Sequence, residues 1–265
     1  MTLNTPDSSA ANSSSLPLAY QRLLALERFK SGFLARTSHE LRSPINTIVS
    51  LHQLILEDLC EGPEEEKEFI GQSKDAALKM LALFDQITAV SKLDIGREPA
   101  KLGAVDLSLL LPEVEMLTTL QAANQNIRYS VELPAEEIEI YTDAKWLKNL
   151  LISLIQDAIP KTKFLSVSVD QTEQSIVIVI KSDRDPKALQ ADLDAIAHAE
   201  ALPDAATPTP TADSIELTTG LVLATAHIAL PLINGEFAIA QQPTDPEDSQ
   251  HDSQHSSELR CLFTK

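Results

Sequence analysis

Apolar residues alternate at steps of three and four along two stretches of the chain, residues 34–55 and residues 70–87. This spacing is typical of a coiled-coil seam, in which each helix buries one apolar stripe against another helix. Gly62 and Pro63 predict a turn between the stretches, and the acidic residues after them suit a helix N-terminus. The sequence therefore predicts a helical hairpin. The seam positions are Leu34, Leu41, Ile45, Ile48 and Ile55, then Ile70, Ala77, Met80, Phe84 and Ile87.

Two helices alone bury too little apolar surface to be stable. A second copy of the hairpin would complete a four-helix bundle, so we expect a homodimer. From about Val105 the pattern changes to alternating helices and strands, and the expected fold class is α+β. The expected division is a disordered tail at 1–17, the hairpin at 18–95, a linker at 96–104 and a second domain at 105–265.

Within the second domain, amphipathic and β-branched runs predict the individual elements. We expect helices at 107–125, 144–159 and 220–233, a loop with a short helix at 186–211, and strands at 127–133, 137–143, 164–170, 175–181 and 259–265.

The formal net charge of −18 disfavours partners that carry many phosphates, such as nucleic acids or anionic membranes. No apolar run reaches the roughly 18 residues of a membrane span, and the polar N-terminus lacks the features of a secretory signal. Cys60 and Cys261 are the two cysteines, too few for a disulfide framework. We therefore expect a cytoplasmic protein.

The segment TSHELRSPIN, residues 37–46, places His39 at the edge of the expected bundle, where an imidazole nitrogen can reach solvent. The adjacent Glu40 could accept the imidazole proton while that nitrogen attacks an electrophile. Pro44 lacks an N–H and clashes with the carbonyl of Glu40, which predicts a bend just past the histidine. A lone His-Glu pair is more often a solvated surface, so the surrounding segment decides the interpretation.

The longer segment FKSGFLARTSHELRSPINTIVS closely resembles the histidine-box helix of the sensor histidine kinases, and ITAVSKLDIG resembles their second dimerisation helix. The resemblance implies that His39 accepts a phosphoryl group from ATP and passes it to an aspartate of a response regulator. It makes Glu40 the assisting base. Ser43, where the family has Thr or Asn, would orient water for dephosphorylation. Arg42 would face an anion, although a solvated surface arginine is equally plausible.

The resemblance extends to the second domain, an α/β sandwich that holds ATP and Mg²⁺ in this family. TDAKWLKNLLISLIQDAIPKTK resembles the asparagine-bearing helix, with Ser153 and Asp157 at the two asparagine positions. Asp157 stands at the Mg²⁺ ligand and could bind that cation through oxygen. Pro160 replaces a basic residue, for which Lys161 and Lys163 are possible substitutes.

The glycine-rich segments of the family are largely missing, and no glycine lies between Gly103 and Gly220. KSDRDPKAL replaces an Asp-x-Gly-x-Gly turn, with Asp183 or Asp185 as the acid that would face adenine. TTGLVLATA keeps Gly220 from the second glycine segment. Each glycine lost at a positive φ costs on the order of 1 kcal/mol, and a side chain there also blocks the ligand.

Two functions remain open. The first is a histidine kinase that autophosphorylates on His39 with ATP and Mg²⁺ and then phosphorylates a response regulator. The alternative is a pseudokinase without cofactor, in which the hairpin docks a regulator receiver domain or carries a phosphoryl group loaded by another kinase. A structural coiled-coil adaptor is a third class, but it gives no reason for the intact histidine box. No sensory domain could fold in residues 1–17, so a separate sensor protein or kinase would supply the input.

Overall fold

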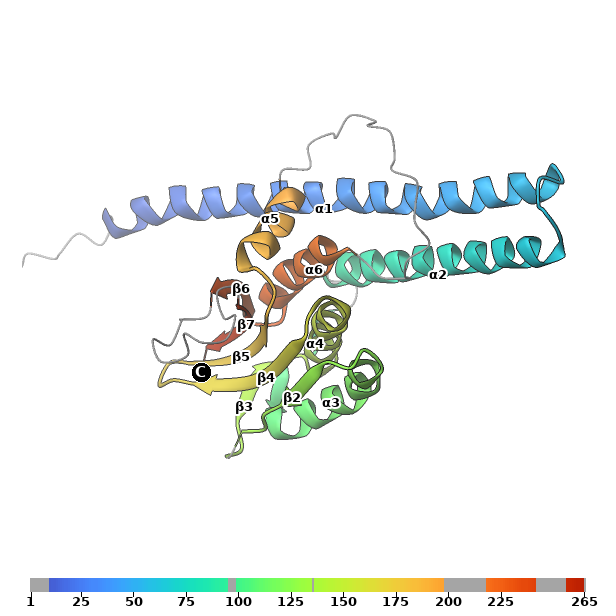
Figure 1. The fold of residues 1–265 in the computed structure, drawn as a ribbon. Helices are drawn as coiled ribbons and strands as arrows, with labels where there is room; N and C mark the ends of the chain where they lie inside the picture. The colour runs from blue at the N-terminus through green and yellow to red at the C-terminus, as the bar shows by residue number, and fades with distance from the viewer. Residues whose placement is uncertain (1–9, 95–98, 135, 198–217, 242–255, 265) are drawn as a thin grey trace, which may run out of the picture.

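The computed structural model describes residues 10–94, 99–134, 136–197, 218–241 and 256–264. Two long helices, α1 (Ala10–Leu56) and α2 (Pro63–Asp94), run side by side as a hairpin, followed by an α/β domain (Figure 1). The predicted class, a helical hairpin followed by an α/β domain, is confirmed. Within the described residues no helix is long and apolar enough to cross a membrane.

Helix α1 begins at Ala10, not at Leu18, and the expected tail at 1–9 lies outside the described residues. The helix extends toward the N-terminus because each residue added to an existing helix gains one hydrogen bond, whereas a new helix must first be nucleated. It also continues through Pro44 without a break, and Pro44 itself is buried. Of the expected linker, residues 96–98 likewise lie outside the description.

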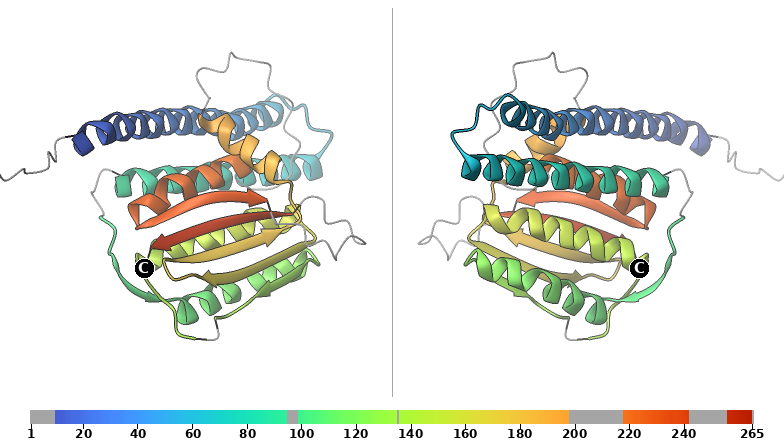
Figure 2. Two further views of the ribbon diagram at one scale, coloured as in Figure 1. Left: turned by 90° about the vertical axis from the view of Figure 1, so that its left-hand side faces the viewer. Right: turned by 90° about the vertical axis from the view of Figure 1, so that its right-hand side faces the viewer.

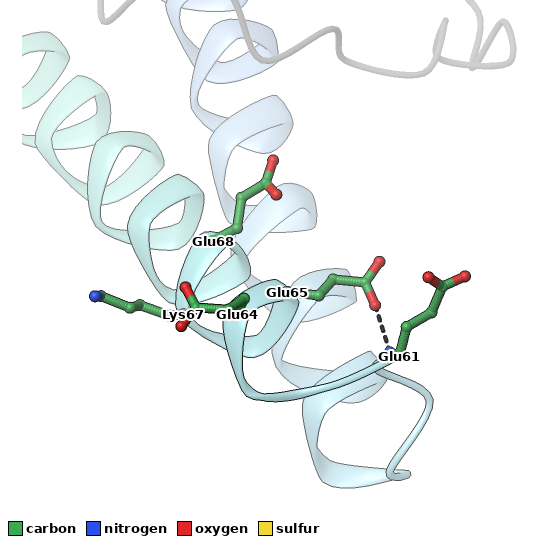
Figure 3. Close-up of a pocket in the computed structure, with 5 residues that line it drawn as sticks. All are labelled: Glu61, Glu64, Glu65, Lys67 and Glu68. Atoms are coloured by element: carbon green, nitrogen blue, oxygen red, sulfur yellow. Dashed lines mark hydrogen bonds between the residues drawn. The ribbon is translucent and has the colours of Figure 1, made fainter.

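The hairpin turn is stabilised by the acidic start of α2 (Figure 3). Glu64, Glu65 and Glu66 occupy the first helical turn, where the partial positive charge of the helix favours carboxylates. The carboxylate of Glu65 points back to the turn and accepts a hydrogen bond from the backbone N–H of Glu61 at 2.5 Å. The turn predicted at Gly62 and Pro63 is therefore closed by the helix that follows it.

A five-stranded sheet forms the centre of the α/β domain, in the order β2-β4-β5-β7-β6, with only the β2–β4 pair parallel. A separate antiparallel pair joins β1 (Gly103–Asp106) to β3 (Glu139–Thr142). The sequence analysis did not predict β1 or β6. The five strands are β2 (Arg128–Val131), β4 (Phe164–Gln171), β5 (Ser175–Ser182), β7 (Ser257–Thr264) and β6 (Gly235–Gln241).

Helices α3 (Leu107–Asn124) and α4 (Ala144–Ala158) lie on one face of the sheet (Figure 2). Each begins at an aspartate that caps it: Asp106 accepts from the backbone N–H of Ser108, and Asp143 from that of Trp146. The core lies between these helices and the sheet, because alternate strand residues point toward them. Buried strand residues include Leu165, Val167, Ile176, Ile178, Ile180, Leu259, Cys261 and Phe263.

Two further helices, α5 (Pro186–Ala197) and α6 (Thr219–Leu232), connect the sheet to the hairpin (Figure 1). Phe29 of α1 is buried and its ring stacks obliquely on His227 of α6, with the ring centroids 4.7 Å apart. Phe33 and Leu83 are buried as well, so both hairpin helices contribute to one continuous core. The histidine helix and the α/β domain are therefore in direct contact.

Candidate functional site

His39 lies half-buried on α1, and its side chain makes no hydrogen bond or ion pair with the residues that the structure describes. Glu40 instead pairs with Arg36, one turn back on α1, at 3.0 Å, and the Glu40 side chain is only 13% exposed. Arg42 is exposed and Ser43 is half-buried. The carbonyl of Ser43 accepts a hydrogen bond from the hydroxyl of Thr47. The histidine is thus accessible, while the neighbouring carboxylate is held by an arginine.

Asp157, the expected Mg²⁺ ligand, is buried at the end of α4 and already has three partners. Its Oδ1 accepts hydrogen bonds from Nζ of Lys161 at 2.5 Å and from Oγ1 of Thr219 at 3.0 Å. Its Oδ2 accepts from Nη1 of Arg184 at 2.9 Å. Lys161 also donates to the Thr219 hydroxyl at 2.9 Å. We call Asp157, Lys161, Arg184 and Thr219 the Asp157 cluster.

Arg184 is the least exposed cation of the Asp157 cluster, with a side-chain exposure of 7%, against 36% for Lys161. Its Nε lies 3.4 Å from the hydroxyl of Ser182, at the end of β5. Its Nη2 is buried and has no hydrogen-bond partner in the described part of the chain. A guanidinium buried to this degree depends on the carboxylate that faces it, because an unpaired buried charge is costly.

The Asp157 cluster does not fit Mg²⁺ and ATP as the family would hold them. A cation bound at Asp157 would compete for carboxylate oxygens that already lie 2.5 Å from Nζ of Lys161 and 2.9 Å from Nη1 of Arg184, and it would be repelled by both positive side chains. Removing Arg184 from Asp157 would leave its guanidinium buried and unpaired. The carboxylate therefore serves an internal ion pair, and among the described residues no group of three or more His, Cys, Asp or Glu side chains could hold a metal ion.

The two aspartates expected near adenine, Asp183 and Asp185, both make contacts within the fold. The carboxylate of Asp183 accepts from the hydroxyl of Thr162 and from the backbone N–H of Lys163, which closes the turn before β4. Asp185 precedes Pro186 and caps α5, since its carboxylate accepts from the backbone N–H of Lys187 at 2.9 Å. Both carboxylates stabilise the local backbone.

Ser153 is half-buried on α4, one turn before Asp157, and Pro160 and Lys163 are exposed. Of the two proposed substitutes for the lost basic residue, only Lys161 reaches Asp157. The structure thus places Lys161 in contact with Asp157, whereas Lys163 lies directly before β4.

Gly220 is buried in the first turn of α6, beneath α5. A Cβ atom added to it would lie 2.9 Å from the backbone oxygen of Asp192, closer than such atoms approach in proteins. The glycine is therefore required by the close packing of α5 on α6.

A cavity of about 410 Å³ separates the histidine helix from the Asp157 cluster. Arg36 of α1 lies on its hairpin side, and Lys161 and Thr219 lie on its α/β side. The rest of its lining is Asp192, Ala195, Ile196, Thr218 and Gly220. Arg36, one turn before His39 and Glu40, thus lines the same cavity as Lys161 and Thr219 of the Asp157 cluster.

Sequence reasoning missed Arg184, Thr219 and Arg36. Arg184 lies 27 residues from Asp157 in the chain, and Thr219 lies 62 residues away, so no local pattern relates them. One signal was available: an acidic residue at a position where the family has a neutral amide calls for a compensating cation nearby.

Comparisons with known proteins find similarity to histidine kinases in sequence and in fold. Residues 29–96 match the His Kinase A (phospho-acceptor) domain. The aerobic respiration control sensor protein ArcB of Escherichia coli K12 is 30% identical over 150 residues, which are 55% of this chain and 19% of ArcB. The non-motile and phage-resistance protein of Caulobacter vibrioides is 29% identical over 136 residues, 50% of this chain and 16% of that protein. The chain thus spans less than a fifth of the length of these relatives.

Solved structures share the fold at low identity. The histidine kinase AdeS of Acinetobacter baumannii superposes with a TM-score of 0.60 at 16% identity, over 85% of this chain and 97% of AdeS. The histidine kinase ThkA, in complex with the response regulator protein TrrA, gives 0.55 at 14% identity, over 100% of this chain and 69% of ThkA. The chain thus has a phospho-acceptor domain match around His39, is similar in sequence to the named relatives, and shares its fold with solved histidine kinases.

Proposed function

We propose that the chain is a phosphotransfer protein of two-component signalling, with His39 as the phosphoacceptor. An imidazole nitrogen attacks phosphorus, a P–N bond forms, and the bond to the donor oxygen breaks. In the second step an aspartate of a response regulator attacks the same phosphorus and His39 is released. The accessible position of His39 within the matched phospho-acceptor domain supports this role. The solved complex of ThkA with the regulator TrrA supports docking of a receiver domain.

The neighbouring side chains have distinct roles in this proposal. Glu40 receives the imidazole proton during attack, and Arg36 positions its carboxylate through their 3.0 Å contact. Ser43, one turn after His39, orients the water that removes phosphate from the regulator. Arg42 is exposed on the same helix and faces the incoming phosphoryl group.

The phosphoryl group comes from another protein and not from ATP held by this chain. The single observation that carries this proposal is the double pairing of Asp157, with Arg184 at 2.9 Å and Lys161 at 2.5 Å. The source is a separate kinase, or a phosphorylated regulator that transfers in the reverse direction. The structural likeness to ShkA, which was solved with AMPPNP, supports the fold of this chain. It does not change the pairing of Asp157 with Arg184 and Lys161.

The working unit is a homodimer formed by the hairpin. Large apolar side chains on both helices are exposed in one chain, which is unfavourable unless a second hairpin covers them. Covering them completes the four-helix bundle. A cytoplasmic location, in keeping with the free thiols of Cys60 and Cys261, is part of the same proposal. The exposed side chains include Leu34, Ile45 and Val49 of α1 and Ile70, Leu78, Leu81 and Phe84 of α2.

The test is a labelling experiment with the purified full chain. It is incubated with γ-labelled ATP and Mg²⁺, alone or with a catalytic amount of an active histidine kinase as donor. We expect acid-labile label only when the donor is present. The variant His39→Gln should lose the label. The matched control His52→Gln removes another histidine of α1, one that hydrogen-bonds to Ser73, and should keep it.

Each outcome decides between the functions. Label without a donor, lost in His39→Gln, would establish a self-sufficient kinase and overturn the proposal about Asp157. Label that persists in His39→Gln would overturn the role of His39. Absence of label with several donors would leave the hairpin as a docking surface only.

A further inference from the structure

The helix α3 carries an exposed apolar stripe on the side turned away from the sheet. Leu109 is 70% exposed, Met116 is 72% exposed and Leu120 is 73% exposed. Leu117, beside Met116 and Leu120, is 52% exposed. The steps of seven, four and three place these side chains along one face of the helix. We call Leu109, Met116, Leu117 and Leu120 the α3 stripe.

The opposite face of α3 is already fully used by the core. A surface helix normally has one apolar face and one polar face, whereas a helix with apolar residues on both faces is usually covered on both. Four large side chains, each half to three-quarters exposed, present several hundred Å² of apolar surface, and patches of this size commonly mark interaction sites. The buried face consists of Leu107, Leu110, Leu111, Val114, Thr118 and Ala122.

Three acidic residues, Glu113, Glu137 and Glu139, lie beside the N-terminal half of the α3 stripe, and we call them its acidic rim. Glu113 lies on α3 between Leu109 and Met116, with its side chain 57% exposed although it pairs with Lys148. The backbone N–H of Leu107 donates to the carbonyl of Ile138 at 2.9 Å, which brings the exposed Glu137 and Glu139 beside the first turn of α3. A partner that covers the stripe must therefore bring its own apolar face together with positive charge.

The place of α3 in the fold argues against a second copy of this chain as the partner. The helix lies at the β2 end of the sheet, the end farther from the hairpin, so the proposed dimer leaves it uncovered (Figure 2). Two copies meeting at this face would bring two acidic rims together, in a chain of net charge −18. The surface fits a different, basic protein.

We propose that the α3 stripe docks an amphipathic helix of another protein, with apolar residues facing Leu109, Met116, Leu117 and Leu120 and with Lys or Arg along its flanks. Met116 has the flexible side chain that suits such an apolar contact surface. Apolar contacts provide most of the affinity, and the acidic rim sets the charge of the partner. This surface lies apart from His39 and would give the α/β domain a binding role of its own.

The probe is a fluorescent model peptide of about five helical turns, with Leu on one face and Lys on the other, titrated with the full chain and followed by anisotropy. A scrambled peptide of the same composition controls for charge alone. A peptide with Glu in place of Lys tests the acidic rim. The stripe variant is Leu117→Ser/Leu120→Ser. The matched control is Leu56→Ser/Leu59→Ser at the hairpin turn, where the two side chains are 82% and 60% exposed.

We expect the dissociation constant of the Leu-Lys peptide to rise at least about tenfold in the stripe variant, the loss of roughly 1.4 kcal/mol of binding, and to stay within about twofold in the control. The scrambled and Leu-Glu peptides should bind at least about tenfold more weakly than the Leu-Lys peptide. Equal binding by stripe variant and wild type, or equal loss in the control, would overturn the proposal. A change of oligomeric state in the stripe variant would identify a second copy as the occupant and also overturn it.

Discussion

Removal of the Asp157 carboxylate is the sharpest test of the altered nucleotide region. In Asp157→Ala, Lys161 can turn toward water because its side chain is 36% exposed. Arg184, 7% exposed, has no such exit. Breaking a buried pair from one side costs about 3–5 kcal/mol. We expect the lower end, about 3 kcal/mol, because Arg184 keeps its contact with Ser182.

The assay is urea unfolding followed by the fluorescence of Trp146, the single tryptophan of the chain, which lies on α4. It therefore reports on the domain that contains the Asp157 cluster. A loss of about 3 kcal/mol corresponds to a fall of roughly 6–12 °C in the melting temperature of a domain of this size. The matched variant Lys161→Met should cost less than about 1 kcal/mol, because the Lys161 side chain is 36% exposed and the buried Asp157 carboxylate keeps its pairing with Arg184.

A double variant tests whether the loss in Asp157→Ala comes from the unpaired charge of Arg184. Asp157→Leu/Arg184→Met removes both charges and should recover about 2 kcal/mol or more of the single loss, since a buried ion pair can be replaced by apolar groups at little cost. The reasoning would be refuted if Asp157→Ala cost less than about 1 kcal/mol. A wild-type unfolding midpoint that rose with Mg²⁺ and ATP would refute it too, because ligand binding to the folded state stabilises that state.

Three further predictions concern packing, pH and assembly. Gly220→Ala should destabilise by about 1–3 kcal/mol in urea unfolding because of the clash with the Asp192 oxygen, whereas Gly71→Ala, with open space around it, should stabilise by about 0.5–1 kcal/mol; equal effects would contradict the packing role. Burial lowers the pKa of His227, so the unfolded chain binds the proton more tightly. The unfolding free energy should be highest above a pH of about 6.5 and should decrease as the pH falls below that value. The variant His227→Gln should weaken this pH dependence; an unchanged pH profile would exclude His227 as its source. Leu81→Glu should halve the mass measured by light scattering, since a charge would then be buried in the bundle, and a wild-type monomer would contradict the dimer.

Local patterns made the hairpin and most of the α/β elements predictable. Helices α1 and α2 follow from a repeat that recurs within every two turns, and β4 and β5 follow from runs of alternating, β-branched residues. Strand β6 was missed because its sequence, GEFAIAQ, is small and mixed in character. It becomes a strand by pairing with β7 along its whole length, from Gly235 opposite Phe263 to Gln241 opposite Ser257.

The candidate site residues likewise include some that local sequence patterns predicted and some that they did not. His39, Glu40, Arg42 and Ser43 were identified from contiguous residues. The environment of Asp157 was not, because Arg184 comes from the bend that follows the distant strand β5 and Thr219 from the start of the distant helix α6. The α3 stripe also escaped the sequence analysis, because the apolar residues on the two faces of α3 differ only in what covers them.

The Asp157 cluster has a consequence for how the α/β domain folds. It joins residues 157, 161, 184 and 219, so it can form only after the ends of α4, β5 and α6 have met. Contacts between positions so far apart in sequence carry a loop-closure cost, which places them late on the folding route. Interactions absent from the transition state act mainly on the rate of unfolding. Substitutions within the Asp157 cluster should therefore increase the unfolding rate of the α/β domain and shorten the lifetime of its folded state. They should leave its folding rate nearly unchanged.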